Sequence, residues 1–446
     1  MKPTLEDIAI TDLSKEELIA KLEQSQQKIR EFEQEQSVAN TIYYITRSLS
    51  QELDLDNLLQ LLMDEVKDVL QADRCTVFLL DESNNELWSR IGHGVEKNEI
   101  RFQSDKGIAG YVVQYGEVVK IDDCYGDPRF NPEIDKKTGY LTRNMLAFPM
   151  RNNLMQMIGV FQVLNKRSGG FTNADLRILE AIAPIAAVQI ENAQLYDEIR
   201  KTFDSLVLTL SQIIDARDPL TAGHSHRIML FADAIAKEER WNTDQREVLK
   251  IAALLHDLGK IGVREAILTK KGKLSKKEFD HLKSHVTHTR TFLQQIYFSG
   301  EFSKVPEIAA SHHERMDGSG YPDGLKGNQI PPGGRILAIA DIFDALTSKR
   351  HYRERMDIRK VMDTMEESAN TEIDGNLVNS FMRITLDKII KILEYENRDK
   401  IKQPDTLILQ QYTLNNLLEA LKSKEKKTRW VKIFFNYYKK TYLSES

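Results

Sequence analysis

The feature that most constrains the fold of this chain is the placement of histidine and acidic residues at the ends of apolar runs. His256 and Asp257 directly follow one such run, His312 and His313 form a second pair, and Asp341 lies inside a third apolar stretch. A buried imidazole or carboxylate costs free energy unless a charged or hydrogen-bonding partner compensates it. We therefore expect these groups to converge in space, where bound metal ions would supply the compensation.

Length and composition bound the class of protein. A chain of 446 residues is too long for one ordinary core, so two or three domains are expected. The net charge of -5 argues against nucleic-acid binding by the whole protein. The two cysteines, Cys75 and Cys124, give no disulfide framework and suit a reducing compartment. Because no apolar run reaches the ~18 residues of a membrane span, and none resembles a signal peptide, we expect a cytoplasmic protein without a transmembrane segment.

Residues 41–192 have the pattern of an α+β domain with an antiparallel sheet and helices packed on one face. A long helix from Asn173 to about Phe203 is expected to close this domain, and Pro184 should kink it or split off its first turns. The other elements predicted from periodicity and turn residues are helices over 53–70 and from Gly107 and strands over 76–81, 86–89, 145–150 and 157–164.

The remainder of the chain is expected to be helical. Residues 193–204 lack Gly and Pro and predict a stiff connecting helix, and residues 205–395 predict an all-α bundle. Within the bundle, the Gly- and Pro-rich stretch 317–334 is the one long loop, and long loops in compact domains are usually functional.

The two ends of the chain each leave two interpretations open. Residues 1–40 predict a helical segment in which Leu18, Leu22, Ile29 and Phe32 recur at near-heptad spacing, so this helix either forms a coiled coil with a second copy or stands alone in water. Residues 396–446 predict a basic and aromatic helical extension. It either contacts an anionic membrane surface or docks on the bundle through its aromatic side chains, and we favour docking.

Seven side chains are candidate metal ligands. Neutral imidazoles bind first-row metals, and carboxylates can bridge two cations. Five histidines and two aspartates exceed the needs of one mononuclear site, and they suit two octahedral ions that share Asp257 and a water molecule. Two such ions can polarise a phosphodiester and activate water for attack. The candidates are His224, His256, Asp257, His285, His312, His313 and Asp341.

Basic residues near these candidates suit a phosphate-containing substrate. Lys260 lies about one helical turn beyond Asp257, where its ammonium can reach a bound phosphate. Arg350 and Arg353 follow the Asp341 helix and supply forked donors for phosphate oxygens.

The segment HHERMDGSGYP, residues 312–322, resembles the defining motif of HD-GYP domains, and the resemblance covers about residues 205–393. It implies a helical bundle that hydrolyses cyclic di-GMP to linear pGpG, and it leaves open a second cut to GMP. It also implies that the seven candidates hold iron or manganese ions, and that Asp257 and Lys260 are catalytic. Substrate contacts are implied for Lys260, Arg350, Arg353, Gly320, Tyr321 and Pro322.

Three positions depart from the HD-GYP pattern. Leu220 stands where members with three metals carry a Glu ligand, so we expect two metal ions. Met316 replaces the usual Trp, and the segment 372–374 replaces the usual Gly-x-His-Phe-Asp. None of these changes removes a ligand of a two-metal site, so we expect an active enzyme.

Residues 41–192 resemble a GAF domain of the cyclic-nucleotide-binding subgroup. Asn165-Lys166, Phe171 and Asp175 match most of the subgroup's signature, and Leu176 stands where its Glu would be. The resemblance implies a pocket for cyclic AMP or cyclic GMP; the alternative is a GAF domain that binds no ligand and only dimerises. The residues expected to line the pocket are Thr76, Ala109, Asp135, Thr138, Thr142 and Gln162.

Together these features predict a homodimeric phosphodiesterase in which a ligand in the first domain shifts the connecting helix and alters access to the metals. Two alternatives stay open. One is a phosphodiesterase for a mixed cyclic dinucleotide such as cyclic GMP-AMP. The other is a signalling scaffold that recruits partners through the Gly-Tyr-Pro surface.

Overall fold

The computed structural model describes residues 15–89, 100–217, 223–270, 272–348, 355–423 and 428–439. These residues divide into two compact units, one up to Lys201 and one from Thr202. None of the helices within the described ranges combines the length and apolar character that a membrane span requires.

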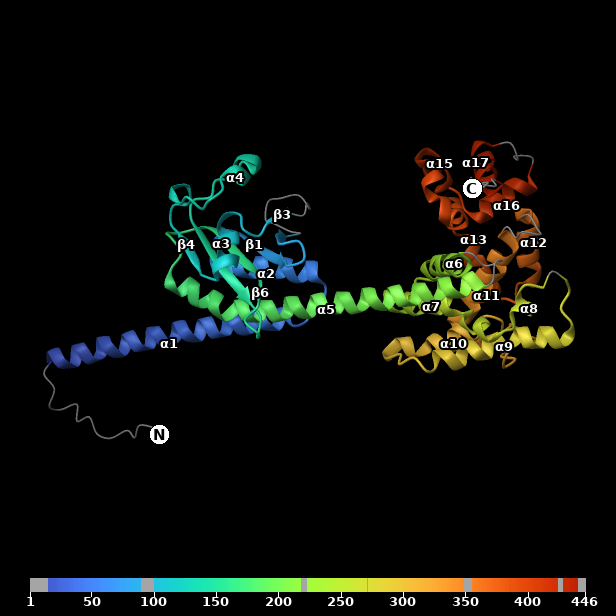
Figure 1. The fold of residues 1–446 in the computed structure, drawn as a ribbon, viewed down its shortest axis with the longest axis horizontal. Helices are drawn as coiled ribbons and strands as arrows, with labels where there is room; N and C mark the ends of the chain where they lie inside the picture. Colours follow the sequence, from blue (N-terminus) through green and yellow to red (C-terminus); the bar gives the residue numbers. More distant parts are fainter. Residues whose placement is uncertain are drawn as a thin grey trace, which may run out of the picture. The chain divides into compact units, whose positions relative to one another are not determined.

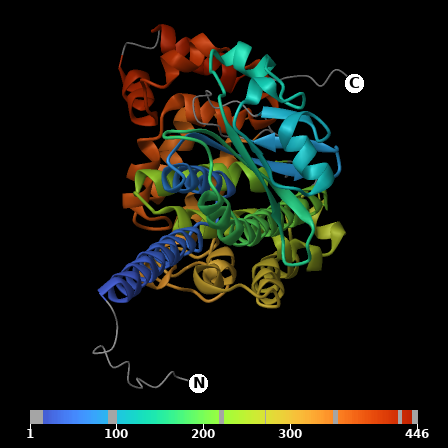
Figure 2. The same cartoon turned by 90° about the vertical axis from the view of Figure 1, so that its left-hand side faces the viewer.

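The first unit is an α+β domain built on one six-stranded sheet, as predicted. The strand order is β3-β2-β1-β6-β5-β4, and all neighbouring strands are antiparallel. Figure 2 draws the strands of this sheet in blue to green. The elements are α1 (Lys15–Leu49), α2 (Leu55–Val69), β1 (Ala72–Asp81), β2 (Glu86–Ser89), β3 (Ile100–Gln103), α3 (Gly107–Tyr115), β4 (Val119–Ile121), α4 (Glu133–Thr138), β5 (Met145–Arg151), β6 (Met157–Lys166) and α5 (Asn173–Arg217).

The sheet has an apolar core on each face because side chains alternate along its strands. Cys75, Val77 and Leu79 of β1 belong to a core that includes buried residues of α2 and α5, whereas Phe78 belongs to a second core that includes α3. The expectation of helices on one face only was therefore wrong. Helix α3 buries the apolar side chains of Ile108, Ala109 and Val112 against the face of the sheet opposite to α2 and α5.

Helix α5 runs from Asn173 to Arg217 as one element and contains Pro184 (Figure 1). The expected separation of its first turns is not observed, and the helix continues well beyond Phe203. Proline removes one backbone hydrogen bond and strains the preceding turn. Here the flanking residues Ile182, Ala183 and Ala186 are buried in the core beneath the sheet, and this packing offsets the loss.

Strands β3 and β4 were not predicted from the sequence. They contain only four and three residues, which is too short for the alternation of apolar and polar residues to be recognised by itself, whereas the equally short β2 was predicted from the turn that precedes it. Each pairs with a longer neighbour, β3 with β2 and β4 with β5, so the sheet rather than local preference determines them.

The regular elements in the described part of the second unit are all helices, apart from two isolated β-bridges, which confirms the predicted all-α bundle. Its α-helices after α5 are α6 (His224–Glu238), α7 (Thr243–Leu255), α8 (Glu265–Leu268), α9 (Lys276–Leu293), α10 (Val305–Ala309), α11 (Pro332–Thr347), α12 (Ile358–Ser368), α13 (Gly375–Met382), α14 (Leu386–Leu393), α15 (Gln403–Leu409), α16 (Leu414–Lys422) and α17 (Arg429–Tyr438).

Helix α17 docks on the bundle. Phe434, Tyr437 and Tyr438 are buried in the core of the second unit, whereas Lys432 and Lys439 are exposed. The Tyr438 hydroxyl also donates a hydrogen bond to the carbonyl oxygen of Met356 at 2.6 Å. This packing supports the docked-helix interpretation of the C-terminal extension.

Helix α1 leaves apolar side chains in water. Leu22, Ile29 and Phe32 are exposed, whereas Ile45 and Leu49 near its end are buried in the core of the first unit. Pairing of this helix with a second copy stays a prediction.

Candidate metal centre

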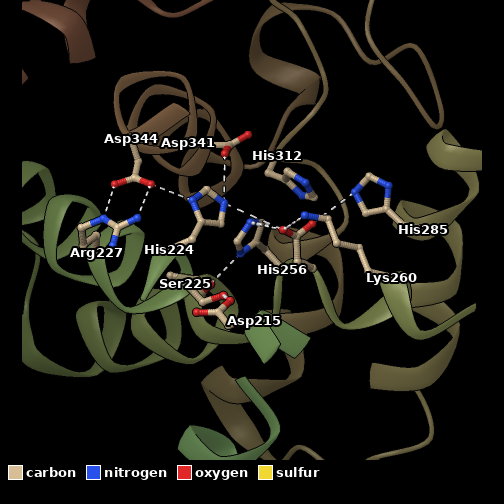
Figure 3. A network of polar contacts seen from close by, with 12 residues as sticks. Asp215, His224, Ser225, Arg227, His256, Lys260, His285, His312, Asp341 and Asp344 are labelled. Atoms are coloured by element: carbon tan, nitrogen blue, oxygen red, sulfur yellow. Dashed lines mark hydrogen bonds and ion pairs between the residues drawn. The ribbon is translucent and has the colours of Figure 1, made fainter. Parts of the chain in front are cut away.

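The second unit brings together the seven candidate ligands from several helices and the residues that follow them. Figure 3 labels five of them, His224, His256, His285, His312 and Asp341. His224 is the first residue of α6, His285 lies in α9, and Asp341 lies in α11. The His256-Asp257 pair follows α7, and the His312-His313 pair follows α10. Their ligand atoms form three overlapping groups, each within 4.8 Å: His285, His312 and His313; His224, His256 and Asp341; His256, Asp257 and His312.

Asp257 lies at the centre of this cluster. Its Oδ2 atom is 3.3 Å from Nε2 of His256 and 3.8 Å from Nε2 of His224, and its Oδ1 atom is 3.4 Å from Nε2 of His285. Lys260 places its ammonium 2.7 Å from Oδ2 of Asp257. One carboxylate thus faces three imidazoles and one cation, an arrangement that suits a carboxylate bridging two metal ions.

Three histidines present the same ring nitrogen to the cluster. The Nδ1 atoms of His256, His285 and His312 lie 2.6 to 2.7 Å from the carbonyl oxygens of Ala253, Leu282 and Ala309, each three residues earlier in the chain. A carbonyl only accepts, so each Nδ1 carries the proton and each Nε2 of a neutral ring keeps its lone pair.

The donor set fits divalent metal ions. The Nε2 atoms of His285 and His312 are buried and have no hydrogen-bond partner, which is costly unless a cation occupies the space they face. Burial lowers the pKa of His313 to about 4 and that of His312 well below its usual range, so both rings are neutral, as metal binding requires. Imidazole nitrogens with two carboxylates are typical of iron, manganese and related ions.

His224 is held differently, by Asp344. Its Nδ1 atom lies 2.7 Å from Oδ2 of Asp344, and Nε of Arg227 donates to Oδ1 of the same carboxylate at 2.6 Å (Figure 3). Burial raises the pKa of Asp344, but the Arg227 guanidinium and His224 outweigh burial and hold this pKa well below its usual range. Asp344 is therefore charged, and it fixes the His224 tautomer with Nε2 free, 3.4 Å from Oδ1 of Asp341.

Sequence reasoning did not identify Asp344 or Arg227. A signal was present, because Asp344 follows Asp341, and Arg227 follows His224, by three residues in a helix. This spacing places both members of each pair on one helical face.

Gly259, two residues after Asp257, has a packing role. Thr289 of α9 accepts a hydrogen bond from the Gly259 amide at 2.8 Å and donates one to the His256 carbonyl at 3.0 Å. A Cβ atom on Gly259 would lie 1.9 Å from the backbone oxygen of His285. The absence of a side chain thus lets α9 approach closely enough to bring His285 to Asp257.

We predict that Gly259→Ala destabilises the second unit by about 2 kcal/mol, the middle of the usual range for overpacked sites. It should also weaken metal binding, because α9 must move away from Asp257. Thermal unfolding with and without manganese measures both effects. Gly272→Ala is the matched control, since a Cβ there meets no atom within 4 Å. Equal unfolding temperatures for the two variants would contradict the packing role.

The Gly-Tyr-Pro loop packs against the ligand histidines. The rings of Tyr321 and His313 are 4.8 Å apart, and the Lys283 ammonium lies 5.0 Å from the Tyr321 ring. A Cβ on Gly320 would lie 2.4 Å from the Arg315 amide nitrogen, so the loop turns tightly here. The buried Glu314 accepts backbone hydrogen bonds from two later loop residues, Asp323 and Leu325.

Of the remaining predicted substrate contacts, Pro322 is half-buried beside Tyr321, whereas Arg350 and Arg353 lie outside the described residues. Leu220, one of the departures from the motif, also lies outside them. The 372–374 segment is held by its neighbours, because the Glu372 carbonyl accepts from the Met316 amide at 3.0 Å and Asp374 pairs with Arg335 of α11 at 2.8 Å. The replacement of Trp by Met316 has no structural explanation, since this bond uses only the backbone.

In the first unit, the structure places three predicted pocket residues on one face of the sheet. Thr76 and Gln162 are paired positions on β1 and β6, on the side of the core that contains Ala109 of α3. Asp135 accepts hydrogen bonds from the amide and the hydroxyl of Thr142 at 2.7 and 2.8 Å, so these two residues bind each other. The side chain of Thr138 lies outside what the structure describes.

Comparisons with known proteins agree with this arrangement. The chain is 42% identical over 171 residues to the 3'3'-cGAMP-specific phosphodiesterase 3 of Vibrio cholerae. The matched segment covers 38% of this chain and 36% of that protein. It is 35% identical over 175 residues to a cyclic di-GMP phosphodiesterase of Thermotoga maritima, covering 39% of this chain and 47% of that protein.

A further relative is the dual 3',5'-cyclic-AMP and -GMP phosphodiesterase 11A of Takifugu rubripes, 33% identical over 211 residues, which cover 44% of this chain and 23% of that protein. This chain spans less than half the length of each of these three relatives. Residues 54–190 match the GAF domain family and residues 208–377 match the HD domain family. The chain therefore carries a GAF domain followed by an HD domain.

Proposed function

We propose that this chain is a metal-dependent phosphodiesterase of the HD-GYP type that hydrolyses cyclic di-GMP to linear pGpG, with GMP as a further product. The observation that carries the proposal is the convergence of five histidines and Asp341 on the site of the buried Asp257 carboxylate. The cyclic dinucleotide phosphodiesterases among the relatives support the substrate class.

Two divalent ions, iron or manganese, would be held by the seven residues, with Asp257 shared between them. When bound, such ions polarise a phosphoryl oxygen and lower the pKa of a water molecule to near neutrality. Burial lowers the pKa of His256, but the Asp257 carboxylate outweighs it and raises this pKa to about 9. The same negative field that favours a proton on His256 favours a cation in the cluster.

The protein's own residues then position the diester and stabilise charge. Lys260 holds a positive charge beside Asp257, where it can neutralise charge that develops on a phosphate during in-line attack. Tyr321 and Lys283 form a wall next to His313 that suits a purine ring and a phosphate. Arg350 and Arg353 are proposed from the sequence as further phosphate contacts.

The GAF domain is proposed to bind a cyclic nucleotide, cyclic AMP or cyclic GMP, at the sheet face that carries Thr76, Ala109 and Gln162. We further propose that the protein acts as a homodimer in the cytoplasm. A ligand at this face would lie against β1 and β6, which also form the core that contains α5 on the opposite face.

A panel of cyclic dinucleotides tests the substrate. Purified, manganese-loaded protein is expected to cleave cyclic di-GMP faster than 3'3'-cyclic GMP-AMP and cyclic di-AMP, with a change in rate when cyclic AMP or cyclic GMP is added. Faster cleavage of 3'3'-cyclic GMP-AMP would favour the second candidate function, which is suggested by the first relative named above. No cleavage of any member by metal-loaded protein would overturn the enzyme assignment and favour a scaffold.

A further inference from the structure

The last turn of α5 is hydrogen-bonded to two segments that carry candidate ligands, the first turn of α6 and the short helix that follows Asp257. Oδ1 of Asp215 accepts a hydrogen bond at 2.8 Å from the hydroxyl of Ser225, which is fully buried and directly follows His224 (Figure 3). Nη2 of Arg217 donates at 3.1 Å to the carbonyl oxygen of Val263. Val263 ends the short 3-10 helix Leu258–Gly262, which begins directly after Asp257 and contains Lys260.

The same helix belongs to the cores of both units. Ile190 and Ala193 are buried in the core of the first unit, whereas Val207 and Ile214 are buried in the core of the second. An α-helix resists changes in its length because each residue is hydrogen-bonded to the next turn. A change in the packing of α5 beneath the sheet is therefore transmitted along a continuous backbone.

We infer that Asp215 and Arg217 are positioning residues that hold His224 and the Asp257–Lys260 segment in register, and that the GAF domain acts on the metal centre through them. This inference rests on the proposed function for the presence of the metals. Asp215 fixes the first turn of α6, which starts at His224. Arg217 fixes the far end of the segment that starts at Asp257. Loss of either contact frees one side of the cluster relative to the other.

Coupling between two sites is reciprocal, so if the packing of α5 changes the metal affinity, metal binding changes the stability of α5 packing by the same free energy. Loading the wild-type protein with manganese is therefore expected to slow amide hydrogen exchange in residues 205–217 by about tenfold or more. The Asp215→Ala and Arg217→Ala double variant should lose this protection. Unchanged exchange in the loaded wild type, or equal protection in the double variant, overturns the coupling.

Manganese affinity tests the positioning role by itself. Asp215→Ala is expected to weaken binding about tenfold, as loss of outer partners of metal ligands usually does. Asp215→Asn keeps an oxygen that accepts from Ser225 and should restore most of the affinity, which a merely global loss of stability would not allow. The matched controls are Asp204→Ala and Arg200→Ala, at exposed positions of the same helix.

Equal manganese affinity in Asp215→Ala, Asp215→Asn and wild type would overturn the positioning role. These readouts use manganese and no nucleotide, so they separate this inference from the proposed function. If manganese protects α5 through Asp215 and Arg217 while no cyclic dinucleotide is cleaved, the substrate assignment fails and the inference stands. The reverse result rejects the inference alone.

Discussion

Replacing Asp257 with Asn is expected to lower cyclic di-GMP hydrolysis at least about a thousandfold, since metal ions contribute several kcal/mol to the transition state and about 4 kcal/mol corresponds to that factor in rate. Among the residues that the structure describes, Asp257 is the one carboxylate that faces three ligand imidazoles and Lys260 together. An amide of the same shape carries no charge and bridges two cations poorly. Elemental analysis should show at most one metal ion per chain, where the wild type is proposed to hold two.

The matched control is Asp280→Asn, an exposed position on α9 whose charge change is identical. This variant should keep wild-type metal content and rate. Full metal content with a large loss of rate in Asp257→Asn would assign Asp257 a role other than bridging. Wild-type rate and metal content together would contradict the candidate centre as a whole.

Five residues of the cluster could be predicted from their sequence surroundings, because His256, Asp257, His312, His313 and Asp341 lie in or beside apolar runs. His224 and His285 lie in polar segments, and their prediction rests on the resemblance to HD-GYP domains. His256 and Asp257 follow α7, whose inner face is apolar, and Asp341 interrupts an otherwise buried run of α11. Groups of this kind need compensation wherever the chain places them. Their convergence on one site could therefore be predicted without knowing how the helices pack.

The side chains that position these ligands could not be predicted from the sequence in the same way. Asp344 is hydrogen-bonded to His224 across 120 positions of the chain, and this contact depends on how α6 packs against α11. Asp215 and Arg217 likewise act through the end of a helix whose length was underestimated, since Phe203 was expected to lie near its end. No periodicity in the sequence shows where a helix continues into a second core.

In the first unit, local patterns identified β1, β2, β5 and β6, but the position of α3 depended on tertiary packing. The strands alternate with period two, which shows two faces but not which helix covers each. Helix α3 covers the face that carries Thr76 and Gln162, and this is the face proposed for the cyclic nucleotide. The error in the predicted layering thus concerned the part of the domain most relevant to ligand binding.

Asp344→Asn is expected to destabilise the second unit by about 3 kcal/mol, the lower end of the cost of breaking a buried ion pair. The change leaves the Arg227 guanidinium, 2.6 Å from the lost charge, without its carboxylate partner. Because the folded-state pKa of Asp344 lies below its ordinary value of 3.8, its contribution is present at neutral pH and is lost as the pH falls below about 4. The stability difference should therefore be constant from about pH 5 to 7 and shrink in acid, as urea unfolding can measure.

The same substitution should weaken metal binding about 10- to 100-fold, because it replaces the anionic acceptor that holds the His224 ring with a neutral amide. A second variant separates this effect from stability. Adding Arg227→Met removes the buried charge that Asp344 neutralised, so the double variant should recover most of the lost stability. It does not restore the anionic acceptor for His224 Nδ1, so metal affinity should stay low. Recovery of both quantities in the double variant would show that Asp344 only neutralises Arg227 and does not orient the ligand.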